Sequence, residues 1–167
     1  MASDGSGLRI FVTVGAQMPF DRLVLGVDAW AAEHPGHEVF AQIGPGAQLP
    51  KTIAYTEFLE PPQFRERVEC CDVLVAHAGM GSILTALQHG KPVLVMPRRG
   101  DLRETRNDHQ VATAKRFRAM DKVAVAMDEQ ELPERLGRIG EMDAAGTISE
   151  FASPQLLEAI RAFIQSS

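Results

Sequence analysis

The chain has 167 residues, a formal net charge of -5 and an apolar fraction of 45%. This length fits one domain and is enough to bury a hydrophobic core without disulfides. The negative charge, with basic residues scattered except for a cluster at 91–106, argues against a nucleic-acid-binding surface. The only cysteines, Cys70 and Cys71, are adjacent, and such a pair builds neither a disulfide framework nor a zinc site, so we expect no metal.

The amino terminus, MASDGSG, has no charged start followed by an apolar stretch, so it does not read as a signal peptide. No apolar run approaches the ~18–20 residues that a membrane span needs. We therefore expect a cytoplasmic chain whose membrane contact, where it has any, comes through a partner. Residues 1–7 are expected to form a flexible tail and residues 8–167 a single domain.

Apolar runs and helical periodicities alternate along the chain. The first run, LRIFVTV, is continuous and β-branched, which is typical of a strand buried on both faces. The expected strands are Leu8–Val14, Glu38–Ile43, Thr52–Phe58, Asp72–His77, Lys91–Pro97 and Lys122–Met127. The expected helices are Asp21–Glu33, one that begins after the prolines at 61–62, Met80–Gly90, Asn107–Phe117, Glu129–Ile139 and Pro154–Ile164.

This alternation predicts an α/β fold, a three-layer Rossmann-like parallel sheet with helices on both faces. Right-handed crossovers place every strand-to-helix loop at the carboxyl edge of the sheet. Ligands of such folds bind at that edge, where the strand order reverses. The loops expected there are 15–20, 58–62, 77–82 and 97–106, and the polar and glycine residues concentrate in them. This edge is the predicted functional site.

The stretch AHAGMGSILTALQHG, residues 76–90, places two glycines and a serine behind a histidine where a strand gives way to a helix. A P-loop is excluded, because Gly90-Lys91 is followed by a proline. A dinucleotide fingerprint is not favoured, because the first turn reads GAQMP and the second strand ends in Gln42 and Ile43 without an acid. The remaining phosphate-binding interpretation is a nucleotide diphosphate held by backbone N–H groups.

Each residue of this junction has a part in that interpretation. Gly79 and Gly81 would let the main chain approach the ligand closely, and Ser82 could cap the helix or bond a phosphate oxygen. The helix N-terminus would stabilise the anion by ~0.3–1 kcal/mol. A structural alternative stays open at this point. The glycines could simply tighten the turn, and His77 could be a neutral histidine bonded to backbone at a strand end.

A second polar cluster, NDHQ, is expected to open a helix at the same edge. Asn107 or Asp108 would fit a helix cap, but a cap does not account for the residues that follow. Amide and carboxylate side chains in this place suit the hydroxyl groups of a sugar. Arg98 would add positive charge near a diphosphate. The charged, glycine-poor segment Leu102–Arg106 is expected to be mobile and to close on the ligand.

The motifs VTVGAQMPFDRLV, FAQIG, CDVLVAHAGMGSILTALQHGKPVLVMPR and NDHQVATA together resemble the nucleotide-sugar-binding half of GT-B glycosyltransferases of the undecaprenyl-lipid GlcNAc transferase type. More narrowly, the chain resembles the small catalytic subunits of split UDP-sugar transferases. These are the asparagine-linked glycosylation GlcNAc transferase and the bacterial exopolysaccharide subunits of the PssE/EpsF kind. The motifs follow the family's order and cover nearly the whole chain.

The resemblance implies a donor-binding catalytic subunit that moves a sugar from a UDP-sugar to a polyprenyl-linked glycan acceptor, as in exopolysaccharide assembly. A membrane-anchored second subunit would bind the acceptor and recruit this chain to the inner face of the membrane. His77 is the implied catalytic residue. The expected substrate-binding residues are Gly15, Gln17, Leu59, Gly79, Met80, Gly81, Ser82, Thr85, Arg98, Asn107, Asp108 and Gln110.

The resemblance gives several of these residues a specific role. The loop of Gly15 and Gln17 would face the diphosphate, the backbone of Leu59 would read the uracil ring, and Gln110 would contact sugar hydroxyls. One position departs from the pattern. Many relatives carry a glutamate that grips both ribose hydroxyls where this chain has Thr85, and a threonine can supply only one such hydrogen bond.

Glycosyl transfer with inversion needs a base for the acceptor hydroxyl and stabilisation of the departing diphosphate, but no cofactor. The phosphate-binding helix would supply the stabilisation, and the base would be His77 or a residue of the partner. Two alternatives stay open. The chain could be a non-catalytic nucleotide-sugar-binding or regulatory subunit, or a Rossmann oxidoreductase that binds NAD(P).

Overall fold

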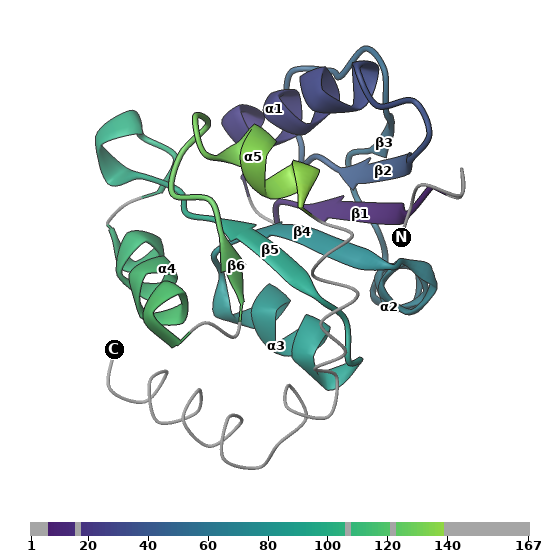
Figure 1. Ribbon diagram of the computed structural model, residues 1–167. Coiled ribbons are helices and arrows are strands. Elements are labelled where there is room, and N and C mark those ends of the chain that lie inside the picture. The colour runs from purple at the N-terminus through teal and green to yellow at the C-terminus, as the bar shows by residue number, and fades with distance from the viewer. Residues whose placement is uncertain (1–6, 16–17, 106–107, 121–122, 139–167) are drawn as a thin grey trace.

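The computed structural model describes residues 7–15, 18–105, 108–120 and 123–138, and all statements below concern these. They form one parallel sheet whose strands lie in the order β3-β2-β1-β4-β5-β6 (Figure 1). The strands are β1 (Arg9–Thr13), β2 (Glu38–Gln42), β3 (Ala54–Thr56), β4 (Val73–His77), β5 (Val93–Met96) and β6 (Ala124–Val125). The predicted Rossmann-like parallel sheet is therefore confirmed.

The helices follow the strands in the predicted alternation. They are α1 (Asp21–Ala32), α2 (Pro61–Cys70), α3 (Met80–Gln88), α4 (His109–Met120) and α5 (Leu132–Gly137), with a 3-10 turn, η2, at Gly100–Leu102. Helix α2 begins at Pro61 itself and not after the double proline as predicted, because a proline fits the first helical position, where its missing N–H has no helical partner. Gln63 Oε1 accepts the N–H of Glu60 to close the first turn. The helix predicted at Pro154–Ile164 and most of the predicted tail lie outside the described residues.

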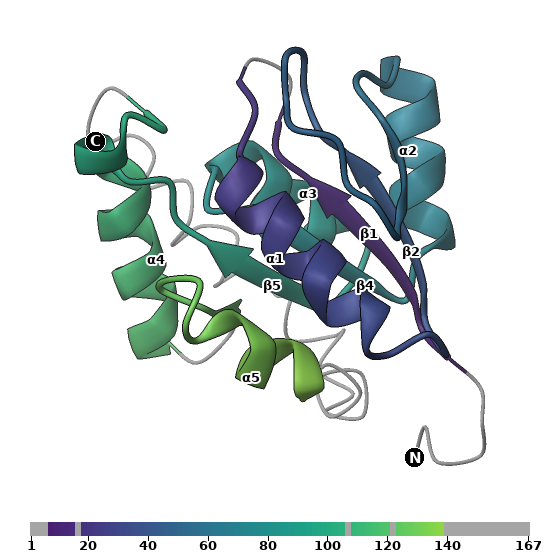
Figure 2. The ribbon, with the colours of Figure 1, turned by 90° about the horizontal axis from the view of Figure 1, so that it is seen from above.

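Two hydrophobic layers enclose the sheet. Helices α1 and α5 cover one face, and α2, α3 and α4 cover the other (Figures 1 and 2). Along β1 the side chains alternate between the layers, so that Ile10 and Val12 face α1 while Phe11 faces α2 and α3. A strand buried on both faces must be continuously apolar, which explains the LRIFVTV run.

The third strand is shorter than predicted, at three residues instead of Thr52–Phe58. The cause is Asp28, a buried residue of α1 whose carboxylate accepts the N–H groups of Lys51, Thr52 and Ile53 at 2.8–3.0 Å. Backbone N–H groups bonded to a side chain cannot also join the sheet ladder. The strand therefore begins only at Ala54.

We expect Asp28→Ala to lower the free energy of unfolding by about 2–4 kcal/mol, because it leaves three N–H groups near the core without their acceptor. Burial by itself raises the pKa of the Asp28 carboxyl, but the three N–H donors outweigh it and lower the pKa below its ordinary value. This contribution is thus present at neutral pH and is lost as the pH falls through the lowered pKa.

Urea unfolding at pH 7 measures the loss, and Asp21→Ala on the same helix is the matched control. Asp21 accepts a single exposed N–H, from Gln48, and should contribute less than about 1 kcal/mol. Equal losses in the two variants would contradict the assignment.

Candidate functional site

A pocket of about 670 Å³ opens at the carboxyl edge of the sheet, beside the point where the strand order reverses between β1 and β4. Its apolar wall comes from the segment between β3 and α2, and its polar wall from the end of β4 and the first turns of α3. The lining residues are Gly15, Gln42, Phe58, Leu59, Pro61, Phe64, Arg65, His77, Gly81, Ser82, Thr85, Gln88 and His89. None of these residues is acidic.

His77, the last residue of β4, lies between two polar side chains. Its Nε2 atom is 3.3 Å from Ser82 Oγ, and its Nδ1 atom is 3.1 Å from Gln110 Nε2. The orientation of the Gln110 amide follows from its other contact, because Gln110 Oε1 accepts the backbone N–H of Arg98 at 3.1 Å. The amide NH₂ must then donate to Nδ1, so the neutral imidazole carries its proton on Nε2, on the side of Ser82 and the pocket.

The imidazole stays neutral in the physiological range. Burial lowers the pKa of His77, and the positive charge of Arg98 lowers it further, to about 4. A group with this pKa holds almost no second proton at pH 7. His77 can therefore donate a hydrogen bond from Nε2 but is a weak acceptor of a proton.

Two glycines make room for this ring. Gly15 has a φ of +83°, and a Cβ on it would lie 2.9 Å from His77 Nε2. A Cβ on Gly79 would overlap His77 Cε1. Gly81 differs from both, because nothing lies within 4 Å of the place that its Cβ would take. The lack of a side chain at Gly79 thus makes room for the His77 ring, whereas Gly81 leaves open space at the N-terminus of α3.

The structure brings six of the predicted residues together in the pocket wall, namely Gly15, Leu59, His77, Gly81, Ser82 and Thr85. Gln110 contacts the far side of His77. Met80 packs against the core on the face of α2, α3 and α4. Two others, Gln17 and Asn107, lie outside the described residues.

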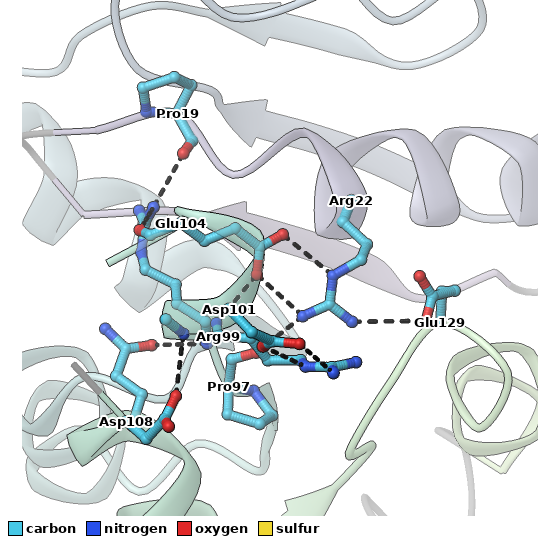
Figure 3. Close-up of polar contacts among 11 residues, drawn as sticks. Pro19, Arg22, Pro97, Arg99, Asp101, Glu104, Asp108 and Glu129 are labelled. Carbon is cyan, nitrogen blue, oxygen red and sulfur yellow. Dashed lines mark hydrogen bonds and ion pairs between the residues drawn. The ribbon is translucent and has the colours of Figure 1, made fainter. Parts of the chain in front are cut away.

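Thr85 and Asp108 make local contacts. Thr85 Oγ1 donates to the carbonyl of Gly81 at 2.8 Å, within its own helix. Asp108 is exposed, and its carboxylate accepts the N–H of Gly100 at 2.9 Å, which ties η2 to the start of α4 (Figure 3).

Sequence reasoning gave no ligand-binding role to seven lining residues, which are Gln42, Phe58, Pro61, Phe64, Arg65, Gln88 and His89. Gln42 is the most informative of them. Its side chain is buried. Its Oε1 atom accepts a hydrogen bond from the Thr13 hydroxyl, and its Nε2 atom donates to the carbonyls of Gly15 and Glu57. The sequence feature that could have identified Gln42 is a polar residue at the end of an otherwise apolar strand, within the motif FAQIG.

The loop between β5 and α4 is fixed by ionic contacts (Figure 3). The guanidinium of Arg22, from α1, bonds both carboxylate oxygens of Glu104 at 2.9–3.0 Å and the carbonyl of Pro97 at 3.1 Å. Glu104 also accepts the N–H of Arg99. These contacts tie the loop to α1, and the expected mobility of residues 102–106 stays a prediction.

The described residues contain no group of three or more His, Cys, Asp or Glu side chains placed to hold a metal ion. Within the same residues, no helix has the length and hydropathy needed to cross a bilayer.

The profile of the glycosyltransferase family 28 C-terminal domain matches residues 9–153. The chain belongs to this family. A curated relative, the UDP-N-acetylglucosamine transferase subunit ALG13 of Mus musculus, is 32% identical over 119 residues, which are 65% of this chain and 10% of that protein. The chain thus spans about a tenth of the length of this relative.

Solved structures confirm the fold of this family 28 domain. MurG of Acinetobacter baumannii is 18% identical with a TM-score of 0.62, over 97% of this chain and 50% of MurG. The glycotransferase of kitacinnamycin is 23% identical with a TM-score of 0.60, over 95% of this chain and 38% of that one. The resemblance to half of a GT-B glycosyltransferase is therefore confirmed.

We expect the free energy of unfolding to fall by about 1–2 kcal/mol between pH 7 and pH 5 because of His77. The unfolded chain takes up a proton near the ordinary histidine pKa of 6.5, whereas the folded chain does so only near 4. The folded state therefore binds fewer protons, and its stability is lost as the pH decreases through this window.

Urea unfolding at a series of pH values measures this dependence. His77→Gln should show a shallower dependence than the wild type. His37, whose pKa burial also lowers, is present in both proteins and cancels in the comparison. Identical slopes would show that His77 titrates normally.

Gly79→Ala and Gly81→Ala form a matched pair two residues apart. The first should displace the imidazole and cost about 1–3 kcal/mol, because its methyl group overlaps His77. The second should change stability by less than about 1 kcal/mol, because its methyl group enters open space. Urea unfolding measures both, and an equal cost would contradict the separate roles of the two glycines.

Proposed function

We propose that this chain is the donor-binding catalytic subunit of a two-component glycosyltransferase that uses a UDP-sugar. The observation that carries the proposal is the pocket between β1 and β4, with an apolar wall on one side and His77, Ser82 and the start of α3 on the other. A nucleotide diphosphate has the matching pair of properties, an aromatic base and a dianion. The name of the relative ALG13, a UDP-N-acetylglucosamine transferase subunit, supports the choice of nucleotide.

In this proposal the diphosphate lies at the N-terminus of α3. The first N–H groups of a helix have no partner within it, and their dipoles favour an anion. Gly81 leaves space beside them, Ser82 offers a hydroxyl, and His77 offers the N–H at Nε2. The base would lie against Phe58, Leu59 and Phe64, which have the apolar character that an aromatic ring needs.

During transfer, the acceptor oxygen bonds to the anomeric carbon while the bond from that carbon to the diphosphate breaks. The diphosphate leaves with the electron pair, and donors fixed in advance stabilise the charge that develops on it. We assign His77 to this task as a neutral donor. Since its pKa is about 4, the base that takes the acceptor proton would come from the second subunit.

The sugar would be read by Gln110, and the pair of Asn107 and Asp108 stays a prediction for its remaining hydroxyls. At the ribose end, the Thr85 hydroxyl donates within α3 and has lone pairs left for one hydrogen bond. Gln88 and His89 line the pocket one helical turn further on and would supply the other contact.

In this proposal the acceptor-binding half is a second polypeptide, in line with the name of the relative ALG13, which is that of a transferase subunit. We propose a membrane-anchored partner that presents a polyprenyl-linked glycan, as in exopolysaccharide assembly, and recruits this chain to the cytoplasmic face of the membrane.

We expect calorimetric titration of the chain with UDP and with UDP-N-acetylglucosamine to give saturable binding, and titration with NAD to give none. Gly81→Ala, which leaves the fold intact, should weaken UDP binding about tenfold or more, because its methyl group enters the space assigned to the diphosphate. Failure of every uridine nucleotide to bind, with and without the partner, would refute the proposal.

A sugar-transfer assay in the reconstituted complex distinguishes a catalytic subunit from a non-catalytic binding subunit. If the chain is catalytic, His77→Ala should lower kcat by about 100-fold, the effect of removing one donor from a developing anion, with the fold intact by circular dichroism. Nucleotide binding with undiminished transfer by His77→Ala would favour the alternative.

A further inference from the structure

Arg98 is a buried cation that makes no contact with a carboxylate side chain among its hydrogen bonds. Its side chain is 4% exposed, and its guanidinium bonds four backbone carbonyls, those of Val14, Met18, Pro19 and Glu104. The two terminal nitrogens of an arginine carry four hydrogens, and each hydrogen has one of these acceptors. The protein itself therefore engages all four N–H groups of the terminal nitrogens.

This saturation bears on the expected role of Arg98 as a donor-binding residue. A ligand phosphate could reach these N–H groups only by displacing a backbone carbonyl that would then lack a partner. The Cζ atom of Arg98 also lies over the ring of Phe20, 5.0 Å from the ring centre. Arg98 is placed to hold protein segments and not to touch the ligand.

The segments that Arg98 holds are those of the pocket. Three of its four acceptors belong to the end of β1 and the loop that leads to α1, the loop that contains Gly15. The backbone N–H of the same residue bonds Gln110 Oε1, and Gln110 in turn bonds His77 Nδ1. One residue thus ties the loop after β1 and the ring of His77 to the end of β5.

The fourth acceptor is itself fixed from α1. Arg22 and Glu104 form a bidentate pair in which both side chains are largely buried, at 11% and 14% exposure. Glu104 also bonds the N–H of Arg99, so the turn that carries its carbonyl is held at both ends (Figure 3). The orientation of Arg98 therefore depends on an ion pair of which it is not itself a member.

We propose that Arg98 is a positioning residue, which sets the loop after β1 and, through Gln110, the orientation of the His77 ring for the donor. The importance of this positioning for catalysis rests on the proposed function. The orientation of the His77 ring, in contrast, can be measured in the protein without a ligand. The positioning role and the proposed function can therefore be tested separately.

Arg98→Lys is the informative variant, because it keeps the positive charge but replaces a planar fork by a single ammonium with three donors. An ammonium cannot reach four carbonyls from different segments, so the loop and the amide of Gln110 lose their fixed geometry. Arg99→Lys is the matched control. Arg99 is the neighbouring residue, and its guanidinium bonds Asp101 on the surface.

The first measurement is the nitrogen NMR spectrum of the His77 ring in the free protein. The wild type and Arg99→Lys should show one neutral tautomer with the proton on Nε2. Arg98→Lys should show a mixture of the two neutral tautomers, since Gln110 no longer selects one. Because the charge is kept, a change in tautomer reports orientation and not electrostatics.

The second measurement is calorimetric binding of UDP. Arg98→Lys should bind UDP at least tenfold more weakly than the wild type, with Arg99→Lys unchanged. Unchanged tautomer and unchanged affinity in Arg98→Lys would overturn the positioning role. A wild type that binds no nucleotide would overturn the proposed function, while the tautomer measurement would still decide whether Arg98 orients His77.

If Arg98→Lys does not fold, Glu104→Gln tests the same inference from a less buried position. It removes the charge that holds Arg22 and loosens the turn that carries the fourth carbonyl. The expected result is the same mixture of tautomers to a smaller extent. A single Nε2–H tautomer and wild-type UDP affinity in folded Glu104→Gln would refute the proposal.

Discussion

The pairing of β1 with β4 is the constraint on which the site depends. These strands are distant in sequence but adjacent in the sheet, where Thr13 lies opposite Ala76. Gly15, two residues after β1, and His77, the last residue of β4, therefore meet at the carboxyl edge. At this edge the chain leaves β1 toward one face of the sheet and β4 toward the other, so the two connections diverge and leave a pocket between them.

Much of this arrangement could be predicted from the sequence, because it depends on local patterns. The strands, the helices and the carboxyl-edge loops follow from apolar runs, from the double proline that opens α2 and from the glycines after β4. The place of the pocket follows from the parallel alternation. The role of Gly79 could not be predicted from the sequence. A glycine is expected both where the backbone must approach a ligand closely and where a neighbouring side chain, here the imidazole of His77, needs room.

What the sequence did not reveal are the contacts between distant segments. Arg22 and Glu104 are 82 positions apart, and Arg98 reaches a carbonyl 84 positions away. Neither pair has a periodicity or a spacing that marks it. The arginine pair at 98–99 reads in sequence as one positive patch, but the fold buries the first member and leaves the second on the surface. Exposure, and not charge, separates their roles.

The electrostatics of the pocket differ from those of the whole chain. The net charge is -5, yet the lining contains Arg65 and no acid, and α3 directs its N-terminus toward the space. Since charges beyond ~8 Å are largely screened, the local groups decide which ligand charge is favoured. The buried Arg98 acts on the same site in another way. Its charge helps to keep His77 neutral, so the imidazole with its proton on Nε2 offers the same hydrogen-bond donor throughout the physiological pH range. Such a group is suited to stabilise an anion that develops beside it and is too weak a base to remove a proton from a hydroxyl, because its pKa lies well below neutrality.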